Sequence, residues 1–420
     1  MRERARLWRK KLNGLLVSTG EAKAIRFACS MPVASAWRER AVAHGGPGIE
    51  GLCDWLIART GATPELIGVA IEITHGPVVE ALLERGFCVY AINPKQLDRF
   101  RDRFTVAGAK DDRRDAQVLG DSLRTDRHAF RRLSNDEPVI VHLREWSRMA
   151  DDLQQERCRL ASRLREQLWR YYPQMLELAD DLAADWFLDL WSQAPTPARA
   201  ARLRATTIER FIKKYRLRRW QASEVLCILK QKPLSVAPGV VEAASDHIRT
   251  LAARIRLVNQ QLKAAHHKLD ELCAQLIPSE DDQPGQQRDV VILRSMPGLG
   301  RIILAVLLAE GWQPLRRRDY HALRILSGVA PVTRRSGKTC VVVRRYARNK
   351  RLENALYHWA RVATQHDALS RRRYAALRRR GHSHGRALRT VADRLLSVAC
   401  TLLEQQTLFD PTHEVGDAAA

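Results

Sequence analysis

The chain has 420 residues, 45% of them hydrophobic, which is enough for two or three domains with buried cores. Its 71 Lys and Arg residues outnumber 47 Asp and Glu residues, which leaves a net charge of +24 and a pI near 10.3. This excess indicates a polyanionic partner, most often nucleic acid, with an anionic membrane surface as the other option. No run of eighteen apolar residues occurs, so the sequence predicts no membrane-spanning helix.

The cysteines and the N-terminus point to one compartment. The eight cysteines are scattered and form no Cys-x-x-Cys pair, which argues against a zinc ribbon or a disulfide framework and fits reduced thiols. Residues 1–14 are basic and lack an apolar core followed by a small-residue cleavage site, so we expect no signal peptide. We therefore expect a cytoplasmic protein without a membrane partner.

Residues 1–134 have the pattern of an α/β domain. Short apolar segments among the first thirty residues are candidate strands, and a helix is expected over 49–58. The β-rich runs 66–73 and 88–92 flank a helix over 77–84, which has Pro in its first turn. Strand, helix and strand in so short a span predict a βαβ layer whose strands are buried on both faces.

Three carboxylates near this layer are candidate metal ligands. Glu72 lies at the carboxyl end of its strand, which is the edge where ligands bind in open α/β sheets. Asp112 and Asp115 stand three residues apart on a predicted helix, so they share one face. Mg²⁺ prefers hard carboxylate oxygens and bridges them to phosphate, whereas an acidic patch answered by neighbouring basic side chains is the commoner arrangement. From these residues alone, both interpretations stay open.

Residues 135–281 are expected to form a long helical region with a coiled coil. An apolar stripe over 143–168 is followed by the clearest periodic element of the chain. Its apolar residues alternate spacings of three and four over four heptads: Ile248, Leu251, Ile255, Val258, Leu262, Ala265, Leu269, Leu272 and Leu276. The seam can pair two protomers, or it can pack as an antiparallel hairpin against 143–168 of the same chain.

Residues 288–406 are expected to form a basic, mostly α-helical domain, followed by a frayed tail over 407–420. Residues 316–396 carry 22 Lys and Arg residues and 4 Asp and Glu residues, a net charge of +18. Apolar residues at helical spacings run through the same stretch, unlike in a solvated tail. The turn at 296–300 resembles a helix-hairpin-helix device, whose N–H groups contact phosphate, although Pro-Gly-Leu-Gly is often only a tight turn.

Two basic groups in this domain are candidate nucleic-acid ligands, because cationic side chains interleaved with aromatic ones suit a phosphate backbone. They comprise Arg334, Arg335, Lys338, Arg344, Arg345 and Arg348, and then Arg371, Arg372, Arg373, Arg378, Arg379 and Arg380. Ser336 sits in a Gly-containing turn of the first group. A serine in a turn is usually only a turn residue, but a serine that attacks a phosphodiester needs this cationic setting. With no adjacent His and no Gly-x-Ser-x-Gly, peptidase or esterase chemistry is poorly supported.

Six short stretches occur in the order and spacing of a known family: 70–72, 90–96, 110–116, 296–300, 327–338 and 348–363. In these stretches the chain resembles the DEDD transposases of bacterial insertion sequences, over about residues 45 to 405. The resemblance implies an RNase H-like N-terminal domain with an Asp-Glu-Asp-Asp tetrad that binds Mg²⁺. Glu72, Asp112 and Asp115 match its second to fourth members, and Ser336 matches the serine nucleophile of the C-terminal transposase domain.

The same resemblance implies how the parts work together. The two domains would meet across a dimer in one composite site, where the serine links covalently to a DNA end. The implied partners are DNA of the element ends and of the target, a structured guide RNA from the element's non-coding end, and further copies of the chain in a dimer or tetramer.

The chain departs from the family pattern at its first strand. The first Asp of the tetrad is expected there, but no Asp occurs before Asp54, and Leu-Leu-Val-Ser-Thr-Gly-Glu over 15–21 replaces a strand ending in Gly-Ile-Asp. Glu21 is the candidate substitute, with a longer side chain than a tight two-metal site suits. The favoured function is therefore an RNA-guided DNA transposase or recombinase. The alternatives are a catalytically inactive copy that still binds nucleic acid and a metal-dependent nuclease of branched DNA.

Overall fold

The computed structural model describes residues 14–18, 24–29, 38–72, 74, 76–92, 94–103, 112–277 and 289–411. The chain divides into two compact units, Met1–Asp136 and Glu137–Ala420. The helical region expected over 135–281 and the basic domain expected over 288–406 therefore fall almost entirely within the second unit.

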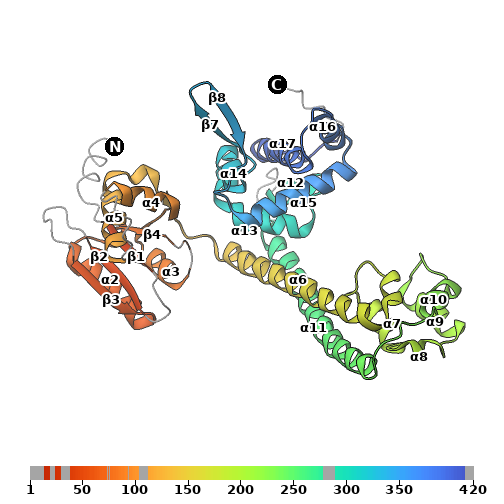
Figure 1. Ribbon diagram of the computed structural model, residues 1–420. Helices are drawn as coiled ribbons and strands as arrows, with labels where there is room; N and C mark the ends of the chain where they lie inside the picture. Colours follow the sequence, from red (N-terminus) through yellow and green to blue (C-terminus); the bar gives the residue numbers. More distant parts are fainter. Residues whose placement is uncertain are drawn as a thin grey trace. The chain divides into compact units, whose positions relative to one another are not determined.

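A six-stranded sheet forms the centre of the first unit, in the order β3-β2-β1-β4-β5-β6 (Figure 1). Its strands are β1 (Gly14–Ser18), β2 (Ala24–Cys29), β3 (Arg38–Ala43), β4 (Gly68–Ile71), β5 (Cys88–Ala91) and β6 (Arg131–Arg132). β1, β4 and β5 are parallel neighbours, whereas β2 runs antiparallel to both β1 and β3, and β6 runs antiparallel to β5. The two strand segments expected among the first thirty residues are thus observed as β1 and β2.

Helices cover both faces of the sheet, as the expected βαβ layer requires. The helical elements are α2 (Gly46–Thr60), η1 (Pro64–Leu66), α3 (Pro77–Glu84), α4 (Pro94–Asp102), α5 (Asp112–Thr125) and η2 (Arg127–Ala129). Val69 of β4 packs in one cluster with residues of α2 and α3, and its neighbour Ala70 packs in another with residues of α4 and α5. Successive strand residues point to opposite faces, so β4 is buried on both sides and its sequence is almost wholly apolar.

The long seam of the second unit is covered within the same chain. It lies on α11 (Val240–Gln275), which packs antiparallel along α6 (Pro138–Tyr171) (Figure 1). Leu164 of α6 shares a core with Ile248 of α11, and Leu143 of α6 shares a second core with Leu269 of α11. Of the two packings that the heptad pattern allowed, the structure shows the intrachain hairpin.

Each end of the α6–α11 pair carries its own hydrophobic core. The first is completed by η3 (Pro173–Glu177), α7 (Asp185–Gln193), α8 (Pro197–Ala200), α9 (Ala205–Tyr215) and α10 (Ala222–Leu229). The second is completed by α12 (Asp289–Ser295), α13 (Arg301–Arg316), α14 (Tyr320–Ser327), α15 (Lys350–His366), α16 (Ala368–Arg379) and α17 (His384–Gln405). The basic region is therefore a folded helical body, as expected. No described helix of either unit is long and apolar enough to cross a bilayer.

A β-hairpin, β7 (Val332–Ser336) with β8 (Thr339–Val343), extends from these helices (Figure 1). The turn was expected from the sequence, whereas the two strands were not. The expected turn over 296–300 does join two helices, α12 and α13. Its Gly298 has φ +75°, and a Cβ at that position would lie 2.7 Å from the Ala363 nitrogen of α15. Trp359 of α15 donates a hydrogen bond to the Pro297 carbonyl at 2.9 Å. The turn is thus packed tightly against α15.

Candidate active site and nucleic-acid surface

Glu72 lies where the sequence placed it, directly after β4 at the carboxyl end of a parallel strand, and its side chain is exposed. In the neighbouring β1, Leu16 stands abreast of Ala70 and Val17 abreast of Ile71. Continuing this register puts Ser18, the last residue of β1, abreast of Glu72. The strand expected to carry the first tetrad Asp therefore ends without a carboxylate, and Glu21 lies outside the described residues.

Asp115 lies on α5, which packs on β4 through the cluster that joins Ala70 to Ala116. Asp115 as a whole residue is only 6% exposed, and both of its carboxylate oxygens are held by the guanidinium of Arg101 on α4. Arg101 Nη2 donates to Asp115 Oδ2 at 2.8 Å, and Arg101 Nε donates to Oδ1. This hydrogen bonding to Asp115 raises the pKa of Arg101. Asp115 and Arg101 therefore form a bidentate pair inside the unit.

Glu72 and Asp115 are the two predicted metal ligands whose side chains the structure describes. Asp112 is the first residue of α5, one helical turn before Asp115, but its side chain lies outside the described part. Within the described part, no three His, Cys, Asp or Glu side chains lie close enough to hold a metal ion. Sequence reasoning missed Arg101, because no local pattern links it to an acid fourteen residues further along.

Ser336 ends β7 at the tip of the hairpin, where it pairs with Thr339 across the two-residue turn Gly337-Lys338. Gly337 has φ +53°, a conformation that favours glycine. Ser336 is exposed, as are its three basic neighbours. Because side chains alternate along a strand, Ser336 shares one face of the hairpin with Arg334, while Arg335 lies on the other face. The expected cationic setting of the serine thus has two distinct sides.

In the first basic group, Arg344, Arg345 and Arg348 have contacts within the fold. Arg344 and Arg348 both pair with Glu353 on α15, Arg348 Nε lying 2.5 Å from Oε2. Burial opposes ionisation of Glu353, but the hydrogen bonds from Arg344 and Arg348 outweigh it and lower the pKa of this carboxyl. Arg345 donates from Nε to the Ala330 carbonyl at 3.3 Å. These contacts fix the segment that connects the hairpin to α15.

The second basic group lies along α16 and just after it, with all six of its arginines exposed. Arg371 donates from Nε to the Thr364 carbonyl at the end of α15, and Arg378 donates to the His382 carbonyl at 2.7 Å. These two therefore also satisfy backbone groups at helix ends. The group as a whole presents a dense positive surface that a phosphate backbone can contact.

Two family models match the chain in separate parts. Residues 23–173 match the transposase model DEDD_Tnp_IS110, and residues 290–375 match a model described as "Transposase IS116/IS110/IS902 family". The first match begins after β1, the strand at which the sequence departs from the DEDD pattern.

Curated relatives cover most of the chain. The "Mini-circle putative transposase for IS117" of Streptomyces coelicolor is 33% identical over 371 residues, which is 86% of this chain and 87% of that protein. The "Insertion element IS110 uncharacterized 43.6 kDa protein" of the same species is 25% identical over 90% of this chain and 91% of its own length. "Putative transposase y4uE" of Sinorhizobium fredii is 58% identical over 185 residues, which span 44% of this chain and about half, 52%, of that relative.

Proposed function

This chain belongs to the IS116/IS110/IS902 family of transposases, and on that premise we propose that it cuts and rejoins DNA strands with Ser336 as its nucleophile. One observation carries the proposal. Ser336 is exposed at the tip of a hairpin, on the same face as Arg334 and next to Lys338, so a phosphodiester can approach it between cations.

The proposed chemistry balances without a high-energy cofactor. Ser336 Oγ loses its proton as it attacks phosphorus and forms an O–P bond, while the bond from phosphorus to the leaving strand breaks and that strand's oxygen takes up a proton, so the proton count is unchanged. The phosphoserine link retains the energy of the phosphodiester for rejoining, when a strand hydroxyl attacks and the serine leaves. Arg334 is placed to stabilise the charge that develops on the phosphoryl oxygens.

We further propose that the first unit is RNase H-like and that Glu72, Asp112 and Asp115 bind Mg²⁺. The sheet order and the single reversed strand β2 among β1–β5 support this fold, because they bring the carboxyl ends of β1 and β4 to one edge. The donor set is chemically suited to Mg²⁺, which when bound would stabilise charge on phosphoryl oxygens. Asp115 would bind the metal only after Arg101 releases at least one oxygen of the Asp115 carboxylate.

The proposed partners are DNA, a structured guide RNA and further copies of the chain, in the cytoplasm. The charge supports the nucleic-acid partners, with a net +18 over 316–396. Trp169 on α6 and Leu257 on α11 are 69% and 55% exposed, and apolar side chains of this kind suit a contact between protomers. A coiled coil between protomers would use this outer surface of the α6–α11 pair.

The test is covalent capture of DNA. The purified chain is incubated with labelled DNA of its element ends, with and without the element's RNA and Mg²⁺, and covalent adducts are separated under denaturing conditions. We expect an adduct with the natural chain and with Thr339→Ala, a control on the facing strand, but none with Ser336→Ala. Cleavage that survives Ser336→Ala would instead identify a metal-dependent nuclease.

The second candidate is an inactive copy that binds nucleic acid, which the lack of a carboxylate at the end of β1 favours. It predicts salt-dependent DNA binding with no adduct at any Mg²⁺ concentration. Ser18→Asp then tests directly whether the missing carboxylate at the end of β1 prevents catalysis. An adduct that appears only in this variant would show that the first tetrad member had been lost.

A further inference from the structure

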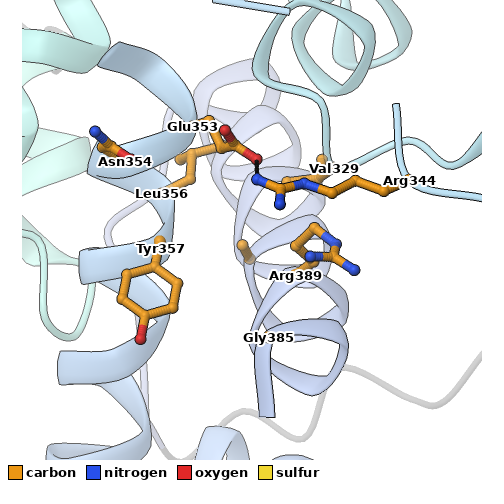
Figure 2. A pocket seen from close by; sticks show the side chains of 9 residues that line it. Val329, Arg344, Glu353, Asn354, Leu356, Tyr357, Gly385 and Arg389 are labelled. Atoms are coloured by element: carbon orange, nitrogen blue, oxygen red, sulfur yellow. Dashed lines mark hydrogen bonds and ion pairs between the residues drawn. The ribbon is translucent and has the colours of Figure 1, made fainter. Parts of the chain in front are cut away.

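A pocket of about 160 Å³ opens between α15, α17 and the segment that follows β8 (Figure 2). Arg344 and Glu353 line one part of it, and Arg389 reaches in from α17. Tyr357 and Gly385 line the remainder, backed by apolar side chains of the core. The pocket therefore combines cations, one acid and an aromatic ring.

Positive charge exceeds negative charge in this pocket. Glu353 is shared, with Oε1 paired to Arg344 and Oε2 paired to Arg348. Arg389 is half-buried, and its guanidinium makes no hydrogen bond or ion pair with any other residue of the described chain. Two guanidinium groups, those of Arg344 and Arg389, therefore line the pocket with one carboxylate, which Arg348 also pairs from outside the lining, and the Arg389 guanidinium has no acceptor.

This arrangement is unfavourable for the protein alone. Burial lowers the pKa of Arg389, and the positive charges of Arg344, Arg348 and Arg386 lower it further, against the opposing effect of Glu353. A half-buried cation without a partner costs stability, and an anion in the pocket would relieve that cost. Guanidinium groups bind phosphate oxygens through two parallel hydrogen bonds, which suits Arg389 with Arg344 beside it.

We propose that this pocket binds one phosphate group of a nucleic-acid backbone between Arg344 and Arg389, with the sugar or base of the same nucleotide against the ring of Tyr357. The inference rests on the proposed function in taking nucleic acid as the ligand, but it assigns a site outside the Ser336 hairpin. Gly385 lies in the first turn of α17, where the absence of a side chain leaves the partial positive charge of the helix terminus accessible.

The neighbourhood of the pocket favours a strand over a free ion. His384 is hydrogen-bonded through Nε2 to the hydroxyl of Tyr357 on α15 at 3.3 Å and through Nδ1 to the hydroxyl of Tyr374 on α16 at 2.8 Å. These bonds fix the Tyr357 ring and connect the pocket to α16, the helix with five exposed arginines. A strand lying on α16 therefore has the pocket within reach, and the aromatic face of Tyr357 allows a base to stack on it.

The first arm of the test uses inorganic phosphate and the full chain. Thermal unfolding is measured with phosphate and with chloride at equal ionic strength, for the natural chain, Arg389→Gln and Arg386→Gln. Arg386 is exposed on the same helix and does not line the pocket. Its substitution therefore removes one positive charge, as Arg389→Gln does, but leaves the pocket lining unchanged. We expect phosphate to raise the Tm of the natural chain and of R386Q but not of R389Q. The phosphate-free Tm of R389Q should equal or exceed that of the natural chain, which shows that it folds.

The second arm uses a fluorescent single-stranded DNA and measures its Kd by anisotropy. We expect R389Q to weaken binding about tenfold, as for loss of a charge-assisted hydrogen bond, and R386Q to weaken it less than threefold. Tyr357→Leu should weaken DNA binding and leave the phosphate response unchanged.

Each remaining outcome overturns a stated part of the inference. If phosphate stabilises the natural chain through Arg389 but R389Q and R386Q bind DNA equally, the pocket serves a free phosphate-bearing ligand and the nucleic-acid assignment is wrong. If phosphate acts equally on all three proteins and the two variants lose equal DNA affinity, the pocket is no anion site. If no protein binds DNA, the proposed function fails, while the phosphate arm still decides whether the anion site exists.

Discussion

Arg101 and Asp115 form a bidentate ion pair that joins α4 to α5 beside the sheet. The pair links an acid expected to bind a metal with a cation that occupies the oxygens the metal would use. Its side chains are only 20% and 8% exposed, so solvent screens their attraction little.

The first prediction concerns competition between Arg101 and Mg²⁺. Arg101→Gln leaves a buried carboxylate without its cation, which should cost about 2–4 kcal/mol of the free energy of unfolding in EDTA. Added Mg²⁺ should restore more of that loss in R101Q than it adds to the natural chain, because Asp115 is then free to bind it. Thermal unfolding over a Mg²⁺ titration measures both effects.

Arg103→Gln is the matched control, since Arg103 pairs with Asp126 at 3.1 Å and both side chains are more exposed than those of Arg101 and Asp115. It should lower the Tm slightly and leave the Mg²⁺ response as in the natural chain. An R101Q variant that responds to Mg²⁺ no more than R103Q does would remove Asp115 from the proposed metal site.

The second prediction separates the two faces of the hairpin. Arg334→Gln and Arg335→Gln each remove one exposed charge, so both should weaken DNA binding by a similar small factor. Only Arg334 shares a face with Ser336, so R334Q should also slow adduct formation about tenfold or more at saturating DNA. Equal rates for the two variants would show that the strand does not approach Ser336 on that face.

The third prediction concerns why the 296–300 turn contains glycine. Gly298 and Gly381 both have positive φ, +75° and +81°, so alanine is strained by about 1 kcal/mol at either position. At Gly298 a Cβ would also meet backbone of α15 at 2.7 Å, whereas nothing lies within 4 Å of one at Gly381. G298A should therefore lower the Tm clearly more than G381A, and equal shifts would contradict the tight packing of this turn on α15.

Patterns that repeat along the chain allowed much of the fold to be predicted. Continuous apolar runs located β4 and β5, a Pro in the first turn located α3, and apolar stripes at helical spacing located the α6–α11 pair, because burial and helix geometry impose these patterns on the sequence. The heptad seam predicted which side of α11 is buried, but it did not determine whether α6 or a second protomer covers it. β3 was missed, since it carries Arg38, Glu39 and Arg40 and lies at the edge of the sheet.

The site was less predictable, because its contacts join residues far apart in the chain. The β7–β8 hairpin did have a local signal, a Gly-containing two-residue turn followed by the β-branched run Val341 to Val343. By contrast, nothing in the local sequence marks Arg389 as unpaired or Arg101 as the partner of Asp115. Such pairings depend on how helices pack, which spacing within one helix does not encode.

The fourth prediction is a loss of stability at mildly acidic pH that depends on His266 of α11. Burial lowers the pKa of His266, the charge of Arg301 lowers it further, and Asp270 acts in the opposite direction. The unfolded chain therefore binds a proton near pH 6.5, while the folded chain takes it up only at lower pH. The contribution of neutral His266 to stability is fully present above pH 6.5. It is lost as the pH falls from the pKa of His266 in the unfolded chain towards its lower pKa in the folded chain.

We expect the Tm of the natural chain to fall between pH 7.5 and 5.5 by more than that of His266→Gln. His247→Gln, an exposed site on the same helix, should follow the natural chain, and a matching slope in H266Q would exclude His266 as the group responsible.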